Sequence, residues 1–370
     1  MTKIKICLVI PSLHPGGMER VMTELANYFV IQPNIDVNLI LYGRERSVFY
    51  SINENIKIYR PSFTFNNQRR LWNTIKTLFF LRQQIRSLHP NTVLSFGEVW
   101  NNMVLMACWG LPYPIFVSDR CQPDKQWSFL QRNLRSLLYP KATGIIAQTD
   151  KAKDIYGAIF PHNNIQVIGN PIRNIDKGTG VVKENIVLSV GRLISTKHHH
   201  ELIRIFARIN PANWKLIIVG GDALKQQNSL LLQALIQELD MTEKIELAGQ
   251  RADVDDFYHK SQIFAFTSSS EGFPNVIGEA MSAGLPVIAY DCVAGPSDLI
   301  DHQETGFLVP LHDTQSFQKH LEQLILDSNL RSKMGIQGRE KIKNFAVPQV
   351  AKAFKNFILN ESATGQFCGQ

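Results

Sequence analysis

The sequence predicts an α/β protein made of two doubly wound domains in tandem. Short runs of Val, Ile and Leu alternate with amphipathic runs along the chain, and such strands between helices are typical of a parallel sheet buried on both faces. This alternating pattern stops at a polar, glycine-rich stretch, residues 171–185, and continues after it. With 370 residues, 44% of them apolar, the chain is long enough for two cores.

The first half contains the pattern of a seven-stranded sheet. Residues 18–30 read as an amphipathic helix between the first two strands. The predicted strands are 3–10, 37–42, 56–60, 91–96, 114–119, 144–149 and 165–170.

The second half repeats the pattern after the stretch at 171–185, which we interpret as a linker because of its glycine and polar content. Six further strands are predicted, at 186–191, 214–221, 245–249, 263–269, 286–291 and 306–310. The domains are assigned to residues 1–172 and 173–346. A cleft between them, at the carboxyl ends of both sheets, is the default ligand site.

Composition favours an intracellular protein without a membrane span. No window approaches the roughly 18 consecutive apolar residues that a span requires. The apolar start at 3–10 is short and runs directly into "PSLHPGG", which favours a first strand over a signal peptide. The five cysteines show neither a C-x-x-C pair nor metal-ligand spacing, so reduced cytosolic thiols are expected.

The net charge of +7 is unevenly distributed. Residues 1–175 hold 20 Lys and Arg against 10 Asp and Glu, whereas 176–370 hold 19 against 22. The basic half therefore suggests an anionic partner. No nucleic-acid-binding motif is visible, so a phosphate-rich membrane face is the favoured candidate. Residues 69–89 form a basic amphipathic helix that either lies on such a surface or packs on its own sheet with a solvated basic face.

Two glutamates follow the strand at 263–269. Glu271 lies in the loop, and Glu279 lies about one turn into a helix that starts at Pro274 or Asn275 and ends before Gly284 and Pro286. A carboxylate only accepts hydrogen bonds, so each acid requires N–H or hydroxyl donors. The residues alone leave two alternatives: ligand binding, or a helix-capping acid and a solvated surface acid.

Polar groups follow other strands at the same edge. Gly16 and Gly17 precede a helix, where a loop without side chains lets amides approach an anion, although a tight turn is an alternative. Arg192 and Lys197 follow the strand at 186–191 and suit a diphosphate, because Arg binds two oxygens while Lys acts as a point charge.

Two motifs invite a metal interpretation, and we predict no metal site at either. Asp253 and Asp255 have the spacing of a D-x-D motif, but they fit the first turn of the helix at 254–260, where the helix dipole favours acids. His198, His199 and His200 are consecutive, and helical neighbours point about 100° apart, so the three cannot close on one ion.

These segments together resemble family 4 of the glycosyltransferases. "EGFPNVIGE" resembles its E-x7-E motif, "PSLHPGGMERVMTELA" its Gly-Gly loop and helix, "SVGRLISTK" its G-R-L-x3-K segment, and "HQETGFLVP" its late turn. The resemblance covers nearly the whole chain. It implies the GT-B fold, with two Rossmann-like domains facing across a cleft, an acceptor-side N-terminal domain that includes a returning helix at about 347–370, and a nucleotide-sugar-binding C-terminal domain.

The resemblance also assigns roles. It implies that Arg192 and Lys197 stabilise the departing diphosphate without a metal ion, that Glu279 holds the ribose and that Glu271 positions the donor sugar. The donor-binding set it implies is Gly16, Gly17, Arg192, Lys197, Arg251, Glu271, Gly272, Phe273, Asn275, Val276 and Glu279.

One position departs from the family pattern. Many members carry a histidine after the fifth N-domain strand, where this chain has Asp119 and Arg120. Either Asp119 orients the acceptor, as a catalytic residue, or it pairs with Arg120, and the sequence leaves both open.

The predicted function is transfer of a hexose or N-acetylhexosamine from a nucleotide sugar, with UDP as the expected carrier, to a glycan or polyprenyl-diphosphate-linked acceptor. Retention of configuration is implied by the resemblance. No cofactor or metal and no nucleic acid are expected. We expect the enzyme in the cytoplasm, associated peripherally with the inner face of the membrane. A GT-B nucleotide-sugar 2-epimerase and a non-catalytic nucleotide-sugar-binding protein remain alternatives.

Overall fold

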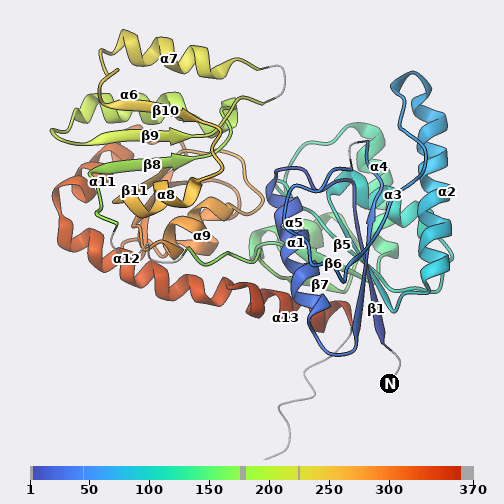
Figure 1. Ribbon diagram of the computed structural model, residues 1–370. Coiled ribbons are helices and arrows are strands. Elements are labelled where there is room, and N and C mark those ends of the chain that lie inside the picture. Colours follow the sequence, from blue (N-terminus) through green and yellow to red (C-terminus); the bar gives the residue numbers. More distant parts are fainter. Residues whose placement is uncertain (1–2, 45, 176–180, 224–225, 360–370) are drawn as a thin grey trace, which may run out of the picture. The chain divides into compact units, whose positions relative to one another are not determined.

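The computed structural model describes residues 3–44, 46–175, 181–223 and 226–359. They divide into two compact units: an N-terminal unit, which runs to Pro171 and resumes at Val347, and a C-terminal unit from Ile172 to Ala346. Each is a parallel sheet covered by helices, as the sequence predicted (Figure 1).

The N-terminal unit is built on a seven-stranded parallel sheet in the order β3-β2-β1-β4-β5-β6-β7. All seven predicted strands are present: β1 (Ile4–Ile10), β2 (Ile35–Leu41), β3 (Lys57–Tyr59), β4 (Thr92–Phe96), β5 (Ile115–Ser118), β6 (Gly144–Ala147) and β7 (Ile165–Val167). The strand order reverses between β1 and β4. Ligands of doubly wound sheets bind at the carboxyl ends beside such a reversal.

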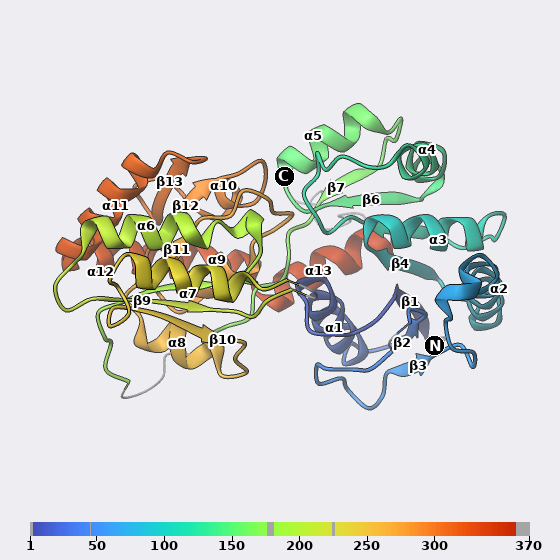
Figure 2. The same ribbon diagram turned by 90° about the horizontal axis from the view of Figure 1, so that it is seen from above.

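Helices cover both faces of this sheet. One face carries α1 (Gly17–Val30) and the returning helix α13 (Val347–Ile358), which pack on each other and on β1, β2 and β4. The opposite face carries α2 (Arg70–Leu88), α3 (Glu98–Cys108), α4 (Phe129–Leu138) and α5 (Asp150–Ile159). Figure 2 shows α1 and α3 on opposite sides of β1 and β4. The inner strands β1, β5 and β6 are mainly apolar because both of their faces are covered, whereas the edge strands β3 and β7 are partly exposed and contain Lys57 and Gln166.

The C-terminal unit is built on a six-stranded parallel sheet in the order β10-β9-β8-β11-β12-β13, with its reversal between β8 and β11. All six predicted strands are present: β8 (Ile186–Val190), β9 (Lys215–Val219), β10 (Ile245–Gly249), β11 (Ile263–Phe266), β12 (Val287–Asp291) and β13 (Gly306–Pro310). Its helices are α6 (His199–Ile209), α7 (Asn228–Glu238), α8 (Val254–Lys260), α9 (Asn275–Ser282), α10 (Pro296–Leu299), α11 (Thr314–Leu326) and α12 (Ser328–Ile342).

The predicted linker at 171–185 differs from expectation where it is described. Ile172 and Ile175 are buried, and the Ile172 amide donates to Phe345 O at 2.7 Å. The Ile175 amide donates to Ser282 Oγ at 2.9 Å. Residues 172–175 are therefore packed into the C-terminal unit, because two isoleucines outweigh the polar composition around them. Residues 176–180 lie outside the described residues.

The helix α12 approaches the end of α9 closely at one glycine. A Cβ added to Gly335 would lie 2.3 Å from the carbonyl oxygen of Gly284, a distance that real Cβ atoms do not tolerate. Gly338, one turn along the same helix, has room, because its nearest atom would be 3.6 Å away. The Gly335 position thus sets how closely the two helices pack.

We predict that Gly335→Ala destabilises the protein by about 1–3 kcal/mol, because the helix must shift to relieve the overlap. Gly338→Ala is the matched control and should be neutral or stabilising by about 0.5–1 kcal/mol, because alanine favours a helix interior. Urea denaturation followed by circular dichroism measures both. Equal midpoint shifts in the two variants would show that the close approach does not matter.

Candidate functional site

The carboxyl ends of β8 and β11 bring charged residues together at the strand-order reversal of the C-terminal unit. Lys197 lies in a short 3-10 helix (Ser195–Lys197) after β8, and its ammonium contacts the Glu271 carboxylate, which follows β11. The two loops are also joined through the backbone: the Ser269 amide donates to Thr196 O at 2.8 Å, and the Thr267 hydroxyl donates to Lys197 O at 2.8 Å. Lys197 and Glu271 are thereby held in one place.

Arg192 differs from Lys197 in having no acidic partner. It follows β8 by two residues and is exposed, and no salt bridge joins it to another residue of the described chain. By contrast, Lys197 and Glu271 expose only 17% and 13% of their side chains. Arg192 is therefore a cation available to an anion, at the same edge as the shielded Lys197–Glu271 pair.

Glu279 is buried in α9, where Arg173 and Tyr258 donate hydrogen bonds to its carboxylate. Its Oε1 accepts from Arg173 Nε at 3.1 Å, and its Oε2 accepts from the Tyr258 hydroxyl at 3.1 Å. Arg173 also donates to Asp255 at 2.6 Å. Burial lowers the pKa of Arg173, but its contacts with Asp255 and Glu279 outweigh this effect and raise the pKa overall. The arginine is therefore charged and can compensate the buried carboxylate.

These positions exclude the simpler interpretation of the two glutamates. Glu279 exposes 5% of its side chain and Glu271 13%, so neither is a solvated surface acid. Glu279 lies in the middle of α9, away from the cap position at Pro274. Both carboxylates are shielded and held by cations.

The loop from Glu271 to α9 contains the other residues predicted around the glutamates. Gly272 and Phe273 are buried, with the Phe273 ring 5.7 Å from that of Phe345. Asn275 begins α9 and its amide donates to Phe273 O at 3.0 Å. Val276, next in the helix, is half-buried. The structure thus brings Lys197, Glu271 and this loop together.

Arg251 lies after β10, at the same edge of the sheet. It binds Asp253 through two hydrogen bonds, at 2.9 and 2.7 Å, and this contact lowers the pKa of Asp253. Asp253 occupies the N-cap position of α8 without a side-chain capping hydrogen bond, and Asp255 lies in the first turn of the helix, as predicted. Because Arg251 and Arg173 occupy these two aspartates, the D-x-D spacing is accounted for by ion pairs.

In the N-terminal unit, Gly16 and Gly17 lie where α1 begins. The Gly16 amide donates to the Tyr50 hydroxyl at 2.8 Å, so this amide already has a partner. Gly17 is the first residue of α1, where first-turn amides lack helical acceptors.

Asp119 does not pair with Arg120, so that alternative from the sequence is wrong. Its buried carboxylate instead contacts Arg135, the Tyr139 hydroxyl and Asn101 Nδ2. Burial raises the pKa of Asp119 to about 6, against the opposing effect of Arg135. Arg135 comes from α4, which the sequence pattern could not place beside the end of β5.

Arg120 contacts an aromatic ring and an asparagine side chain. Its guanidinium lies 3.6 Å from the centre of the Phe96 ring and donates to Asn170 Oδ1 at 2.5 Å. The amide of Cys121 donates to Glu98 Oε1 at 2.6 Å, and the Arg120 amide binds the same oxygen. Burial lowers the pKa of Arg120 to about 9. Glu98, which begins α3, was not predicted, because it carries no motif.

The three histidines at 198–200 do not share one environment. His199 begins α6 and turns inward, where its Nε2 lies 3.3 Å from Arg192 O and burial lowers its pKa to about 4. His198 caps the helix in a left-handed conformation, with φ of 47°. The expectation that the three cannot bind one ion stays a prediction, and the regular helical spacing on which it rested does not apply to His198. Ligand atoms of His198, His200 and Glu201 lie within 4.8 Å of one another.

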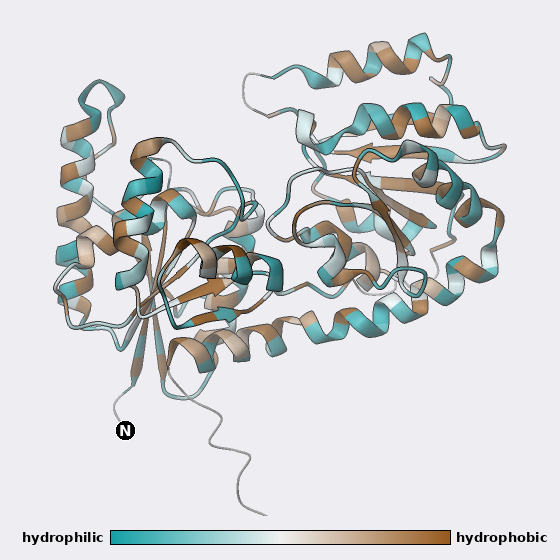
Figure 3. Ribbon diagram, turned by 180° about the vertical axis from the view of Figure 1, so that it is seen from behind, coloured by the Kyte–Doolittle hydropathy of each residue, from teal (hydrophilic) through white to brown (hydrophobic). Residues whose placement is uncertain are grey.

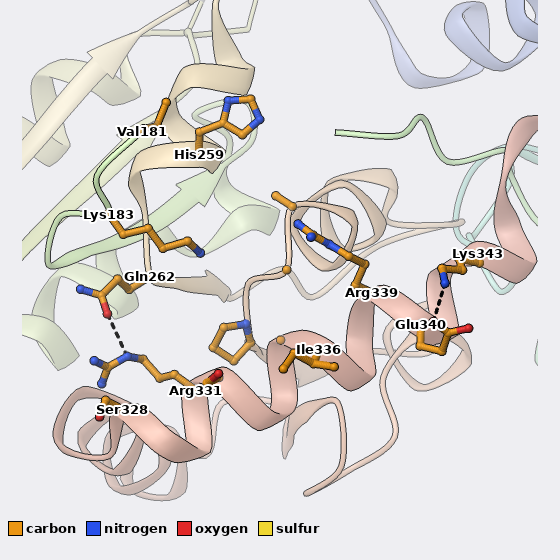
Figure 4. A pocket seen from close by; sticks show the side chains of 15 residues that line it. Val181, Lys183, His259, Gln262, Ser328, Arg331, Ile336, Arg339, Glu340 and Lys343 are labelled. Atoms are coloured by element: carbon orange, nitrogen blue, oxygen red, sulfur yellow. Dashed lines mark hydrogen bonds and ion pairs between the residues drawn. The ribbon is translucent and has the colours of Figure 1, made fainter. Parts of the chain in front are cut away.

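A separate pocket of about 550 Å³ lies at the opposite, amino edge of the C-terminal sheet (Figure 4). Its lining includes Lys183, Gln262, Arg331 and Arg339. Arg331 donates to Gln262 Oε1 at 3.1 Å and Arg339 to Ser282 O at 3.0 Å. Both arginines therefore form hydrogen bonds within the protein. The residues that line the pocket include neither Glu271 nor Lys197.

The described helices include none that is long and apolar enough to cross a membrane.

Comparisons with known proteins cover almost the entire chain. A family model described as "Glycosyltransferase Family 4" matches residues 15–173, and one described as "Glycosyl transferases group 1" matches residues 172–341. The chain is 27% identical over 349 residues to an uncharacterized glycosyltransferase of Haemophilus influenzae, with 93% of this chain and 96% of that protein covered.

A second relative has a named reaction. The chain is 28% identical over 380 residues to the N-acetylgalactosamine-N,N'-diacetylbacillosaminyl-diphospho-undecaprenol 4-alpha-N-acetylgalactosaminyltransferase of Campylobacter jejuni, covering 96% of this chain and 99% of that protein. Among solved structures, sucrose-phosphate synthase from Thermosynechococcus elongatus matches with a TM-score of 0.82 at 16% identity, covering 98% of this chain and 100% of that one. This likeness concerns the fold, which is GT-B.

Proposed function

The chain belongs to family 4 of the glycosyltransferases, and we propose that it transfers a hexose or N-acetylhexosamine from a nucleotide sugar to a lipid-linked glycan with retention of configuration. We further propose UDP as the carrier nucleotide, and no metal ion or other cofactor for the reaction. The acceptor proposal draws on the Campylobacter relative, whose name specifies a diphospho-undecaprenol-linked acceptor and an alpha linkage.

One observation carries the proposal: an exposed Arg192, which forms no ion pair with any described residue, lies at the same sheet edge as the Lys197–Glu271 pair. Breaking a sugar–phosphate bond leaves negative charge on the diphosphate. Fixed cations at that position lower the barrier, because they interact most strongly as the charge develops. Arg192 and Lys197 can supply this stabilisation through their own charges.

The two glutamates fit roles in holding the donor. A carboxylate only accepts hydrogen bonds, and a ribose offers paired hydroxyl donors. We assign Glu279 to the ribose hydroxyls, because Arg173 and Tyr258 hold its carboxylate in a fixed position. Glu271 can accept hydroxyls of the donor sugar, while Lys197 exchanges part of its contact with Glu271 for the diphosphate. Glu271 then positions the sugar and forms no bond to it.

We propose that the N-terminal unit serves the acceptor at the inner face of the membrane. The helices α2 and α4 expose large apolar side chains between basic ones, visible as brown and teal segments along α2 in Figure 3. Exposed apolar residues with basic neighbours favour an anionic lipid surface. The apolar members are Leu71, Trp72, Phe79, Phe129, Leu130 and Leu137.

The function is tested by turnover with UDP-hexoses and UDP-N-acetylhexosamines and a polyprenyl-diphosphate-linked acceptor, in a chelator. We expect transfer to persist in the chelator. In the same assay, Arg192→Ala should lower turnover at saturating substrates on the order of 10²-fold, because one preorganised stabiliser of developing charge is lost. Donor affinity should change less than turnover.

The control for this variant is Arg208→Ala, an exposed arginine about 14 Å along α6 from its first residue, which should leave turnover unchanged. Transfer that requires Mg²⁺ or Mn²⁺ would contradict metal independence. Release of an epimerised nucleotide sugar, or donor binding without transfer across the panel, would replace the proposed function by one of its alternatives. If turnover survives in Arg192→Ala while affinity falls, Arg192 is a binding residue.

We predict that Glu279→Gln weakens UDP binding by roughly 10- to 100-fold, because a charged hydrogen bond contributes about 1.5–3 kcal/mol. Asp255→Asn is the matched control, because Asp255 shares Arg173 with Glu279 but is assigned no donor contact. Calorimetric titration measures both dissociation constants. Equal weakening in the two variants would mean that Glu279 acts only by holding Arg173.

We predict that the protein floats with vesicles containing anionic lipid and not with neutral vesicles, and that salt releases it, because exposed charges are screened over about 8 Å at physiological ionic strength. The double variant Lys76→Glu/Arg132→Glu, in α2 and α4, should reduce flotation. The control is Lys319→Glu/Lys333→Glu in the C-terminal unit, which changes the net charge equally. Identical losses in both variants would show that net charge alone determines binding.

A further inference from the structure

The C-terminal unit contains a cluster of three histidines and a glutamate that the proposed reaction does not use. His198, His200 and Glu201 come from the start of α6, and His312 comes from the loop after β13. The nitrogens of the three imidazoles lie around a single carboxylate oxygen, Glu201 Oε1: His312 Nδ1 at 2.9 Å, His198 Nδ1 at 3.4 Å and His200 Nε2 at 4.0 Å.

We propose that this cluster, which we call the His198 cluster, binds a divalent first-row metal ion such as Zn²⁺. The ligand atoms are His198 Nδ1, His200 Nε2 and Glu201 Oε1, with His312 Nδ1 as the fourth. Atoms of His198, His200 and Glu201 already lie within 4.8 Å of one another. Zinc–nitrogen and zinc–oxygen bonds of about 2.0–2.2 Å in a tetrahedron place ligand atoms roughly 3.3 Å apart. The three imidazole nitrogens lie 2.9 to 4.0 Å from Glu201 Oε1.

The two ring nitrogens of His198 face different partners. Its Nε2 lies 2.8 Å from the Ser269 hydroxyl, and its Nδ1 lies 3.4 Å from Glu201 Oε1. In the tautomer with the proton on Nε2, the ring presents the lone pair of Nδ1 to the Glu201 carboxylate. Two acceptors facing each other repel unless a proton or a cation lies between them.

The outer contacts of the cluster resemble those that orient metal ligands. Ser269 fixes the His198 ring, and the Tyr290 hydroxyl donates to Glu201 Oε2 at 2.8 Å, which leaves Oε1 directed at the imidazoles. Such outer-shell partners set the tautomer and direction of metal ligands. His198 and His312 both have left-handed backbones, with φ of 47° and 64°. This conformation is uncommon outside glycine, and it allows the two rings to converge.

The ligand types define the class of ion. Imidazole with one carboxylate suits Zn²⁺, Ni²⁺ and Cu²⁺ better than Mg²⁺ or Ca²⁺, which prefer oxygen ligands. His200 and His312 expose about half of their side chains, so an ion can enter from solvent. The site is not assigned to the transfer step, and this inference does not rest on the proposed function.

The test is metal binding to the full chain, measured by competition between the protein and a chromophoric chelator for Zn²⁺ and by the absorption spectrum with Co²⁺. We expect one equivalent bound, and at least a tenfold weaker affinity in His200→Asn and in His312→Asn. The His200→Asn variant gives the clearest test, because the only described polar contact of His200 is with Glu201 and the variant should therefore fold normally. The circular dichroism melting profile checks this.

The matched control is His89→Asn in the N-terminal unit, where an exposed histidine also has a left-handed backbone, with φ of 47°, and asparagine tolerates that conformation. Its zinc affinity should equal that of the unchanged protein. Equal affinity in all three variants would overturn the proposal. A Co²⁺ spectrum dominated by thiolate charge transfer would also overturn it, because the ion would then be bound by cysteines.

Discussion

The joining of the β8 and β11 loops at the strand-order reversal of the C-terminal sheet is the constraint on which the rest of the site depends. The carboxyl ends of parallel strands all lie on one edge of the sheet. At the reversal, the chain leaves the neighbouring strands β8 and β11 toward opposite sides, so the loops after these two strands lie next to each other. The amide of Ser269 and the hydroxyl of Thr267 bind the β8 loop there. These hydrogen bonds hold the loop after β8 in place, and this loop contains both Lys197 and His198.

Buried carboxylates in this protein are stable only because each is compensated by fixed donors. Glu279 has Arg173 and Tyr258, and Asp119 has Arg135, Tyr139 and Asn101. Removing one partner of a buried pair strongly lowers the stability of the folded protein, because an uncompensated charge remains in a medium of low polarity. The difference between the two sites is that Glu279 stands beside a loop at the sheet edge, whereas Asp119 is enclosed by its network.

The strands were predictable from sequence, because strands that are buried on both faces of a sheet consist of nearly continuous apolar residues. Residues next to those strands were predictable as well, since Arg192, Lys197 and Glu271 follow strand ends that must share an edge. The partners of the charges were not. Arg173 lies in a stretch that reads as linker, and Arg135 lies in a helix, so neither Glu279 nor Asp119 could be paired from spacing. Such pairings depend on tertiary packing between segments 106 and 16 residues apart.

The histidines show the same limit in a more local form. Helical spacing separates consecutive side chains by about 100°, but it describes His199 and His200 only. His198 has left-handed dihedrals because the chain turns sharply from the 3-10 helix at Lys197 into α6. The His198 ring lies against Glu201, with Nδ1 3.4 Å from Oε1. The turn that places Lys197 at the sheet edge therefore also creates the His198 cluster. The proposed diphosphate-binding Lys197 and the proposed metal ligand His198 are therefore adjacent residues with different partners, Glu271 and Glu201.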